Sequence, residues 1–162
     1  MGTFMTITLH LGVLDVPYTT SETTTGEVAE KLEEDYGIME FFAEEQAAFI
    51  GQVLEKDLCN FLDKMLRGKK LKSEPFNSSC QKIERLFKQS LTAEFMNGNG
   101  SGSKAVPTRA ALAGVNHRFA DPYFITRTSK KTGKVSKVKR KRRPSFIDTG
   151  IYRQSFKAWI EL

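Results

Sequence analysis

The stretch IMEFFAEEQAAFIGQVLEKDLCNFLDKML at residues 38–66 decides the fold. Its apolar residues recur at steps of three and four, the spacing that places them on one face of a helix. We therefore expect one long amphipathic helix of about 29 residues, about 43 Å long at 1.5 Å per residue. The residues of this helix that we expect in the core are Phe42, Phe49, Val53, Leu54, Phe61 and Leu62.

The segments on either side of this helix predict its surroundings. Apolar and polar residues alternate from Met5 to Val13, which indicates a half-buried strand. Threonines at 19–25 offer N-caps for a short acidic helix that ends near Gly37. A third helix is expected after Asn77, Ser78 and Ser79, which could cap it. Its expected core residues are Ile83, Leu86 and Phe87.

The second half of the chain has little apolar periodicity. Residues 97–104 (NGNGSGSK) predict a flexible loop, because glycine, serine and asparagine cannot build a core. A short helix is expected at 107–112. Residues 123–143 predict a two-stranded hairpin that projects as an extended arm, since ten basic residues and no acid lie between Arg127 and Arg143. The expected architecture is α+β in a single domain, 1–162: the long helix packs on a small, mostly antiparallel sheet with the basic hairpin projecting.

The charge of the chain is divided between its two parts. Residues 1–66 carry thirteen acids and three lysines, a net of −10, so the remainder carries +16. A chain of this kind suits contact between the acidic part of one copy and the basic part of another, and it also suits nucleic acid.

Several classes of protein are disfavoured by the sequence. No apolar run approaches the roughly 18 residues that cross a bilayer, and no secretory signal is present, so we expect no membrane contact. Cys59 and Cys80 form no disulfide framework and no zinc motif. His10 and His117 stand apart from any nucleophile pattern. We therefore expect a protein that is not an enzyme and holds neither metal nor cofactor.

The basic run at the end of the hairpin is the first candidate contact site. It comprises Lys137, Lys139, Arg140, Lys141, Arg142 and Arg143. Phosphate binding by such a run would be salt-dependent. No aromatic residue interleaves with these side chains to stack on bases, and no recognition helix accompanies them. The favoured interpretation is an arm that docks on acidic protein, and the alternatives are non-specific DNA contact and a nuclear-localisation-like stretch.

Three stretches resemble structural proteins of tailed bacteriophages. They are TTGEVAEKLE at 24–33 with YGIM at 36–39, PTRAALAGVNHR at 107–118, and RPSFIDTGIYRQSFKAW at 143–159. The last also resembles, more loosely, the Asp-Thr-Gly-x-x-x-x-Ser element of virion morphogenesis proteins that complete tails or join heads to tails. Partner contacts are accordingly expected from Asp148, Thr149, Gly150, Tyr152, Ser155 and Trp159.

The resemblance implies a structural role. It implies an α+β subunit assembled as a ring, hexameric in expectation, that completes or connects the tail tube at the neck as a tail terminator or head–tail joining protein. The partners would be other copies, the tail tube and neighbouring neck or baseplate proteins. The location would be the virion tail, after assembly in the host bacterial cytoplasm. The alternatives are a distal tail-tip or baseplate ring protein that joins tube to baseplate, and a basic DNA-binding accessory protein.

Overall fold

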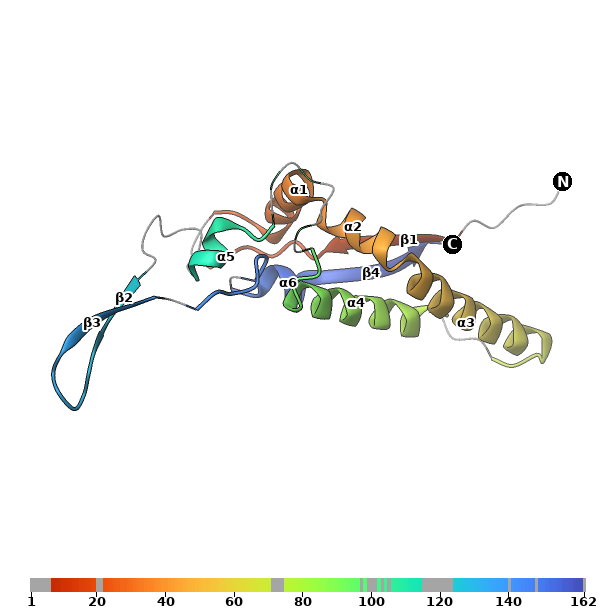
Figure 1. The fold of residues 1–162 in the computed structure, drawn as a ribbon. Coiled ribbons are helices and arrows are strands. Elements are labelled where there is room, and N and C mark those ends of the chain that lie inside the picture. The colour runs from red at the N-terminus through yellow and green to blue at the C-terminus, as the bar shows by residue number, and fades with distance from the viewer. Residues whose placement is uncertain are drawn as a thin grey trace.

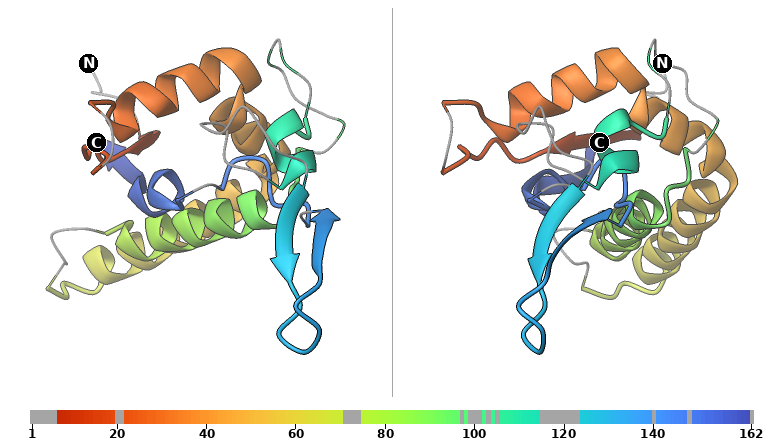
Figure 2. Two further views of the ribbon diagram at one scale, coloured as in Figure 1. Left: turned by 90° about the vertical axis from the view of Figure 1, so that its left-hand side faces the viewer. Right: turned by 60° about the vertical axis from the view of Figure 1, so that its left-hand side comes forward.

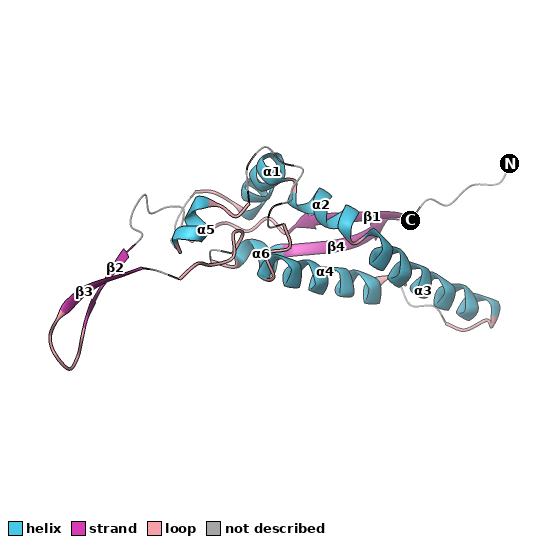
Figure 3. Cartoon of the chain, viewed as in Figure 1, coloured by secondary structure: helices cyan, strands magenta, loops and turns pink. Residues whose placement is uncertain are grey.

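A computed structural model describes residues 7–19, 22–70, 75–96, 98, 102, 104, 106–114, 124–139, 141–147 and 149–161. These residues form a mixed α+β structure that is mostly helical (Figures 1, 2 and 3). In chain order the elements are β1 (Thr8–Val13), α1 (Thr25–Tyr36), α2 (Ile38–Glu45), α3 (Ala47–Leu66), α4 (Asn77–Thr92), α5 (Arg109–Ala113), β2 (Phe124–Thr128), β3 (Val135–Lys139), α6 (Ile151–Ser155) and β4 (Phe156–Glu161).

The sheet of the body joins the two ends of the described chain. β1 pairs with β4 in antiparallel register, with Thr8 opposite Glu161 and Val13 opposite Phe156. The helix that runs along this sheet is α4, which lies beside β4, while α3 packs on α4 (Figure 1). Of the long helix that was expected to pack on the sheet, only the first part does so: Phe42 of α2 meets Phe156 of β4 with 6.5 Å between ring centroids, whereas α3 packs on α4. The described sheet has two strands, and α4 occupies the side on which α3 would have to lie.

The long helix expected at 38–66 is two helices. α2 ends at Glu45 and α3 begins at Ala47, with Gln46 between them at φ −104° and ψ 11°. The break changes the direction of the chain (Figure 1). It lets Phe42 of α2 face the centre of the body while Val53 of α3 faces α4.

Local side-chain contacts fix the start of the helical part. Thr24 and Glu27 form a capping box at the start of α1, as the threonine-rich stretch predicts. Gly37 ends α1 in the left-handed conformation, at φ 61° and ψ 46°, which a residue without a Cβ adopts at little cost. The Glu33 carboxylate then accepts hydrogen bonds from the N–H groups of Met39 and Glu40 at 2.8 and 2.9 Å, and so caps α2 from the preceding helix.

The core lies where α2, α4 and β4 meet. Phe87 of α4 stacks on Phe156 of β4 with 3.7 Å between ring centroids, and Phe42 of α2 meets Phe87 edge-on at 5.1 Å. All three side chains are fully buried. Because aromatic pairs in these geometries contribute beyond their buried area, this cluster holds helix and sheet together.

The predicted core residues divide into three groups. The buried ones, for which the prediction is confirmed, are Phe42, Val53, Ile83 and Phe87. Leu54, Phe61 and Leu86 are half-buried. Phe49 and Leu62 are 36% and 47% exposed, so their assignment to the core is wrong. The reason is that α3 extends beyond the rest of the body, and α4 covers only part of its apolar face (Figure 1).

The other predicted segments differ in detail. The basic hairpin forms between Phe124 and Lys139 and projects from one end of the body (Figure 1). In the segment 97–104, Gly102 N–H donates to Tyr36 O at 3.2 Å and Lys104 N–H donates to Asp35 O at 2.9 Å, so these two residues lie against the end of α1. Residues 97, 99–101 and 103 lie outside the described part of the chain, as do Met5 of the expected strand and Tyr123 of the expected arm.

Candidate functional site

The hairpin is the most prominent surface feature. β2 and β3 pair from Phe124 opposite Lys139 to Thr128 opposite Val135, which puts Lys137 and Lys139 on β3. Residues 128–136 are exposed, and the turn carries the exposed lysines Lys130, Lys131 and Lys134. No third strand pairs with β2 or β3 in the part of the chain that the structure describes, and an isolated strand pair has little stability of its own.

The end of the predicted basic run does not project. Arg142 forms an ion pair with Glu94, just beyond the end of α4. Arg143 Nη1 donates to the carbonyl oxygens of Pro144 and Ile147 at 3.2 and 2.7 Å. The expectation that the arm reaches to 143 is corrected, because these two side chains find acceptors on the body. Lys141 is exposed, and Arg140 lies outside the described residues.

A pocket collects four of the predicted contact residues. Arg143, Thr149, Gly150 and Tyr152 all line a cavity of about 560 Å³ between α1, the start of α5 and the segment that enters α6. α1 supplies apolar residues and a lysine to its wall. Asp148, the first residue of the Asp-Thr-Gly element, lies outside the described residues.

Tyr152 is the unusual member of this pocket. The residue is 4% exposed, and its phenolic oxygen has no hydrogen-bond partner among the described residues. Burial is the main cause that raises the pKa of this phenol, and the nearby Glu33 carboxylate adds to it. The hydroxyl therefore stays protonated, and leaving it unpaired costs free energy.

Trp159 and Ser155 lie apart from the pocket, on the sheet and at its entry. Trp159 is 49% exposed and stacks on His10 with 5.3 Å between ring centroids. His10 Nε2 also lies 3.1 Å from a carboxylate oxygen of Glu161. A Cβ on Gly12 would lie 3.1 Å from the indole, so the glycine makes room for the ring. Ser155 is buried, and its carbonyl oxygen accepts from Leu14 N–H at 2.8 Å.

An acidic surface follows α1, α2 and α3. Glu30, Glu44, Glu45 and Glu55 are exposed and form no ion pair among the described residues. Other carboxylates bind cations of the same chain. Asp35 lies 2.6 Å from Lys104 Nζ, and this hydrogen bond raises the pKa of the lysine. The division of charge predicted from the sequence therefore appears as unpaired acids on the helices and exposed lysines on the hairpin.

The described residues show neither a metal site nor a membrane helix. No group of three His, Cys, Asp or Glu side chains is placed to hold a metal ion within the described ranges. No helix formed by those residues is long and apolar enough to cross a bilayer. Cys59 is exposed and Cys80 is buried, and neither forms a disulfide among the described residues. His117 lies outside the described residues.

Comparison with known proteins adds no relative: no family model, no curated protein and no solved structure matches this chain. Functional inference therefore rests on the residues and their arrangement. The feature that sequence reasoning missed is the pocket, because its wall combines α1 with segments more than 70 residues away along the chain. The Asp-Thr-Gly stretch was the signal that pointed to part of it.

Proposed function

We propose that this protein is a non-enzymatic structural component of a tailed-bacteriophage virion, forming an oligomeric ring, hexameric in expectation, that completes or connects the tail tube at the neck. The observation that carries the proposal is the separation of charge: a hairpin with exposed lysines projects from one end, and the helices carry unpaired carboxylates. Complementary charges on two surfaces of one subunit favour contact between copies in a fixed orientation.

The surface supports an assembling role in two further ways. Exposed apolar side chains lie along the outer part of α3, where Leu62, Met65 and Leu66 are 47%, 51% and 88% exposed. Exposed apolar patches are typical of contact surfaces. The pocket lined by Arg143, Thr149 and Gly150 is a second candidate for contact with a neighbouring neck or tail protein.

The test is the assembly state of the purified protein and its ability to complete tails. We expect native mass spectrometry to detect a closed oligomer, six copies in expectation, and electron microscopy to show rings. Replacing Lys130, Lys131, Lys134 and Lys141 by serine should leave the fold intact and weaken assembly. The control replaces Lys56 of α3 and Arg85 of α4 by serine, two exposed cations that lie outside the hairpin and outside the apolar end of α3. Equal effects of the two variants would contradict the proposal.

The second candidate function is a DNA-binding accessory protein. It is favoured by the exposed lysines at the hairpin turn, which could bind phosphates. In that case the wild type should retard duplex DNA with an affinity that falls steeply between about 50 and 200 mM salt. The hairpin variant should then lose DNA binding and keep its assembly state. The alternative within the structural class is a ring at the distal tail tip or baseplate. Binding of the purified ring to the tail tube end or to the baseplate distinguishes the two.

A further inference from the structure

The two edges of the β1–β4 sheet differ. In an antiparallel pair, residues alternate between those whose backbone groups face the partner strand and those whose groups face outward. The Leu14 N–H donates to Ser155 O, so in this register Gly12, His10 and Thr8 face β4. The backbone groups of Leu9, Leu11 and Val13 therefore point away from β4, along the outer edge of β1.

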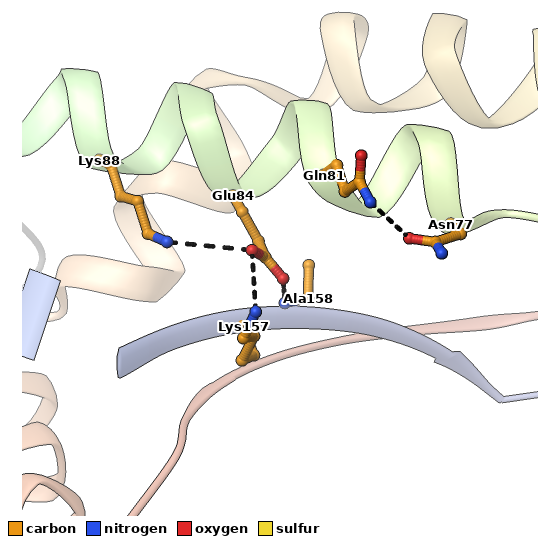
Figure 4. A network of polar contacts seen from close by, with 6 residues as sticks. All are labelled: Asn77, Gln81, Glu84, Lys88, Lys157 and Ala158. Atoms are coloured by element: carbon orange, nitrogen blue, oxygen red, sulfur yellow. Dashed lines mark hydrogen bonds and ion pairs between the residues drawn. The ribbon is translucent and has the colours of Figure 1, made fainter. Parts of the chain in front are cut away.

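A helix side chain closes the edge of β4. The Ala158 N–H, which points outward by the same alternation, donates to Glu84 Oε1 of α4 at 3.3 Å. Figure 4 shows this contact together with Lys157 and Lys88, whose Nζ atoms lie 3.4 and 3.9 Å from the other oxygen of Glu84. Because α4 runs along β4 and its carboxylate binds the central outward N–H, a further strand cannot pair there.

The edge of β1 has no such closure. The outward backbone N–H and C=O groups of Leu9, Leu11 and Val13 have no hydrogen-bond partner among the described residues. A row of unpaired groups on an edge strand is a template for another strand. Three or more strands make a much more stable sheet than two.

The hairpin has the complementary property. Ser129 N–H donates to Lys134 O at 3.0 Å. In the β2–β3 register, the backbone N–H and C=O groups of Thr126 on β2 and of Lys137 on β3 therefore point away from the partner strand. Among the described residues these outward backbone groups have no hydrogen-bond partner on either strand. The hairpin lies at the far side of the body from the end at which β4 finishes (Figure 1). A copy cannot reach its own β1 edge with this arm.

We propose that the open edge of β1 accepts the β2–β3 hairpin of a second copy of this chain, so that a four-stranded sheet forms across the contact. The inference rests on the proposed function, since it names the contact that joins the copies. Charge complementarity supports this occupant: the hairpin turn carries three exposed lysines, and α1, which packs beside β1, presents the exposed Glu30. Strand addition supplies the affinity through main-chain hydrogen bonds.

Proline tests the contact on both sides, since it removes one backbone N–H. Leu11→Pro removes an outward N–H and keeps every hydrogen bond between β1 and β4. Leu11→Ala is its matched control, because it loses the same side chain and keeps the N–H. On the hairpin, Thr126→Pro and Lys137→Pro address the two edges, with Thr126→Ala and Lys137→Ala as controls. Circular dichroism at high dilution verifies that each variant folds.

We expect Leu11→Pro and one of the two hairpin prolines to raise the concentration of half-dissociation at least tenfold over their alanine controls. Hydrogen exchange gives an independent readout: the amides of Leu9, Leu11 and Val13 should exchange slowly in the oligomer and at least tenfold faster in the dilute monomer. A wild type that assembles while all proline variants match their controls would overturn this inference and leave the proposed function standing.

Two mixed outcomes also overturn the inference. If Leu11→Pro dissociates the oligomer and neither hairpin proline does, the edge accepts a different segment. If only the hairpin prolines act, the arm docks elsewhere. A wild type that stays monomeric at every concentration and in the presence of tail proteins would overturn the inference and the proposed function together.

Discussion

Ser79 of α4 binds Asp57 of α3 through two of its atoms: the Ser79 N–H and Oγ lie 2.9 and 2.7 Å from the same carboxylate oxygen. The Oγ also lies 2.6 Å from Val53 O. Phe76, at the N-cap of α4, offers no side-chain hydrogen bond, and the predicted caps Asn77, Ser78 and Ser79 lie inside the helix. Asp57 therefore caps α4 from the neighbouring helix, which fixes how α3 and α4 pack.

Removing this cap should destabilise the fold. We expect Asp57→Ala to lower the free energy of unfolding by about 1–3 kcal/mol, because it leaves the Ser79 N–H unpaired at the start of α4, while the Ser79 hydroxyl keeps Val53 O as its acceptor. Asp63→Ala is the control, since it breaks an exposed ion pair with Arg67 on the same helix and should cost less than about 1 kcal/mol. Urea titration measures both. Equal losses of free energy for the two variants would show that the Asp57–Ser79 contact stabilises the fold no more than an exposed ion pair does.

The aromatic cluster gives a second test. Phe87→Ala removes a fully buried ring stacked on Phe156 and should cost about 3–5 kcal/mol. Phe49→Ala truncates a ring that is 36% exposed and should cost much less. Thermal and chemical unfolding of the two variants compares the two environments directly. A larger loss for Phe49→Ala in the monomer would contradict the packing described here.

Acid should weaken the contact between the end of β1 and α1. Asp15 accepts hydrogen bonds from the Thr24 side chain and from Gly26 N–H, and these lower its pKa in the folded state. A lowered pKa stabilises the fold above the unfolded value of about 4, and this contribution is lost as the pH falls through the folded value. We expect Asp15→Ala to lower the melting temperature at pH 7 and to have a smaller effect at pH 2.5.

The control for that measurement is Glu22→Ala, an exposed glutamate that precedes α1 and forms no ion pair among the described residues. Its melting temperature should follow that of the wild type across the same pH range. If the melting temperature of Asp15→Ala fell further below that of the wild type at acidic pH, the pH dependence would have the opposite sign. That result would contradict the lowered pKa of Asp15 in the folded state.

Arg143 and Lys141 should differ although both belong to the predicted basic run. The Arg143 guanidinium binds two main-chain oxygens, so Arg143→Ala should cost about 1.5–3 kcal/mol. Lys141 is exposed, and Lys141→Ala should stay within about 0.5 kcal/mol of the wild type. Denaturant unfolding distinguishes them. Identical free energies of unfolding for the two variants would show that the Arg143 hydrogen bonds do not stabilise the fold.

Periodicity predicted the elements well where local chemistry decides them. The strand at β1, the capped helix α1, the helix α4 and the antiparallel hairpin are confirmed, because alternation, capping residues and helical spacing act over a few residues. The break at Gln46 was missed. Apolar residues continue at helical spacing on both sides of it, and only packing against α4 and the sheet selects two directions instead of one.

The candidate site was predictable only in part, for a related reason. The basic run could be recognised by its composition. The partner of Arg142 is Glu94, 48 residues away, and the bend that brings Ile147 O to Arg143 forms only on folding. The pocket beside Tyr152 likewise depends on how α1 meets the segment before α6. Long-range contacts of this kind leave no local pattern.

The Glu84 carboxylate, by covering the edge of β4, also limits how many neighbours the sheet of one subunit can bind. A subunit with one open edge on its body sheet and one hairpin has two different contact sites. Copies joined as proposed therefore add head to tail in a single direction. Only a closed ring leaves no β1 edge and no hairpin unused. A copy without its hairpin would still be captured by the preceding hairpin and could capture nothing itself, so small amounts of it would stop growth.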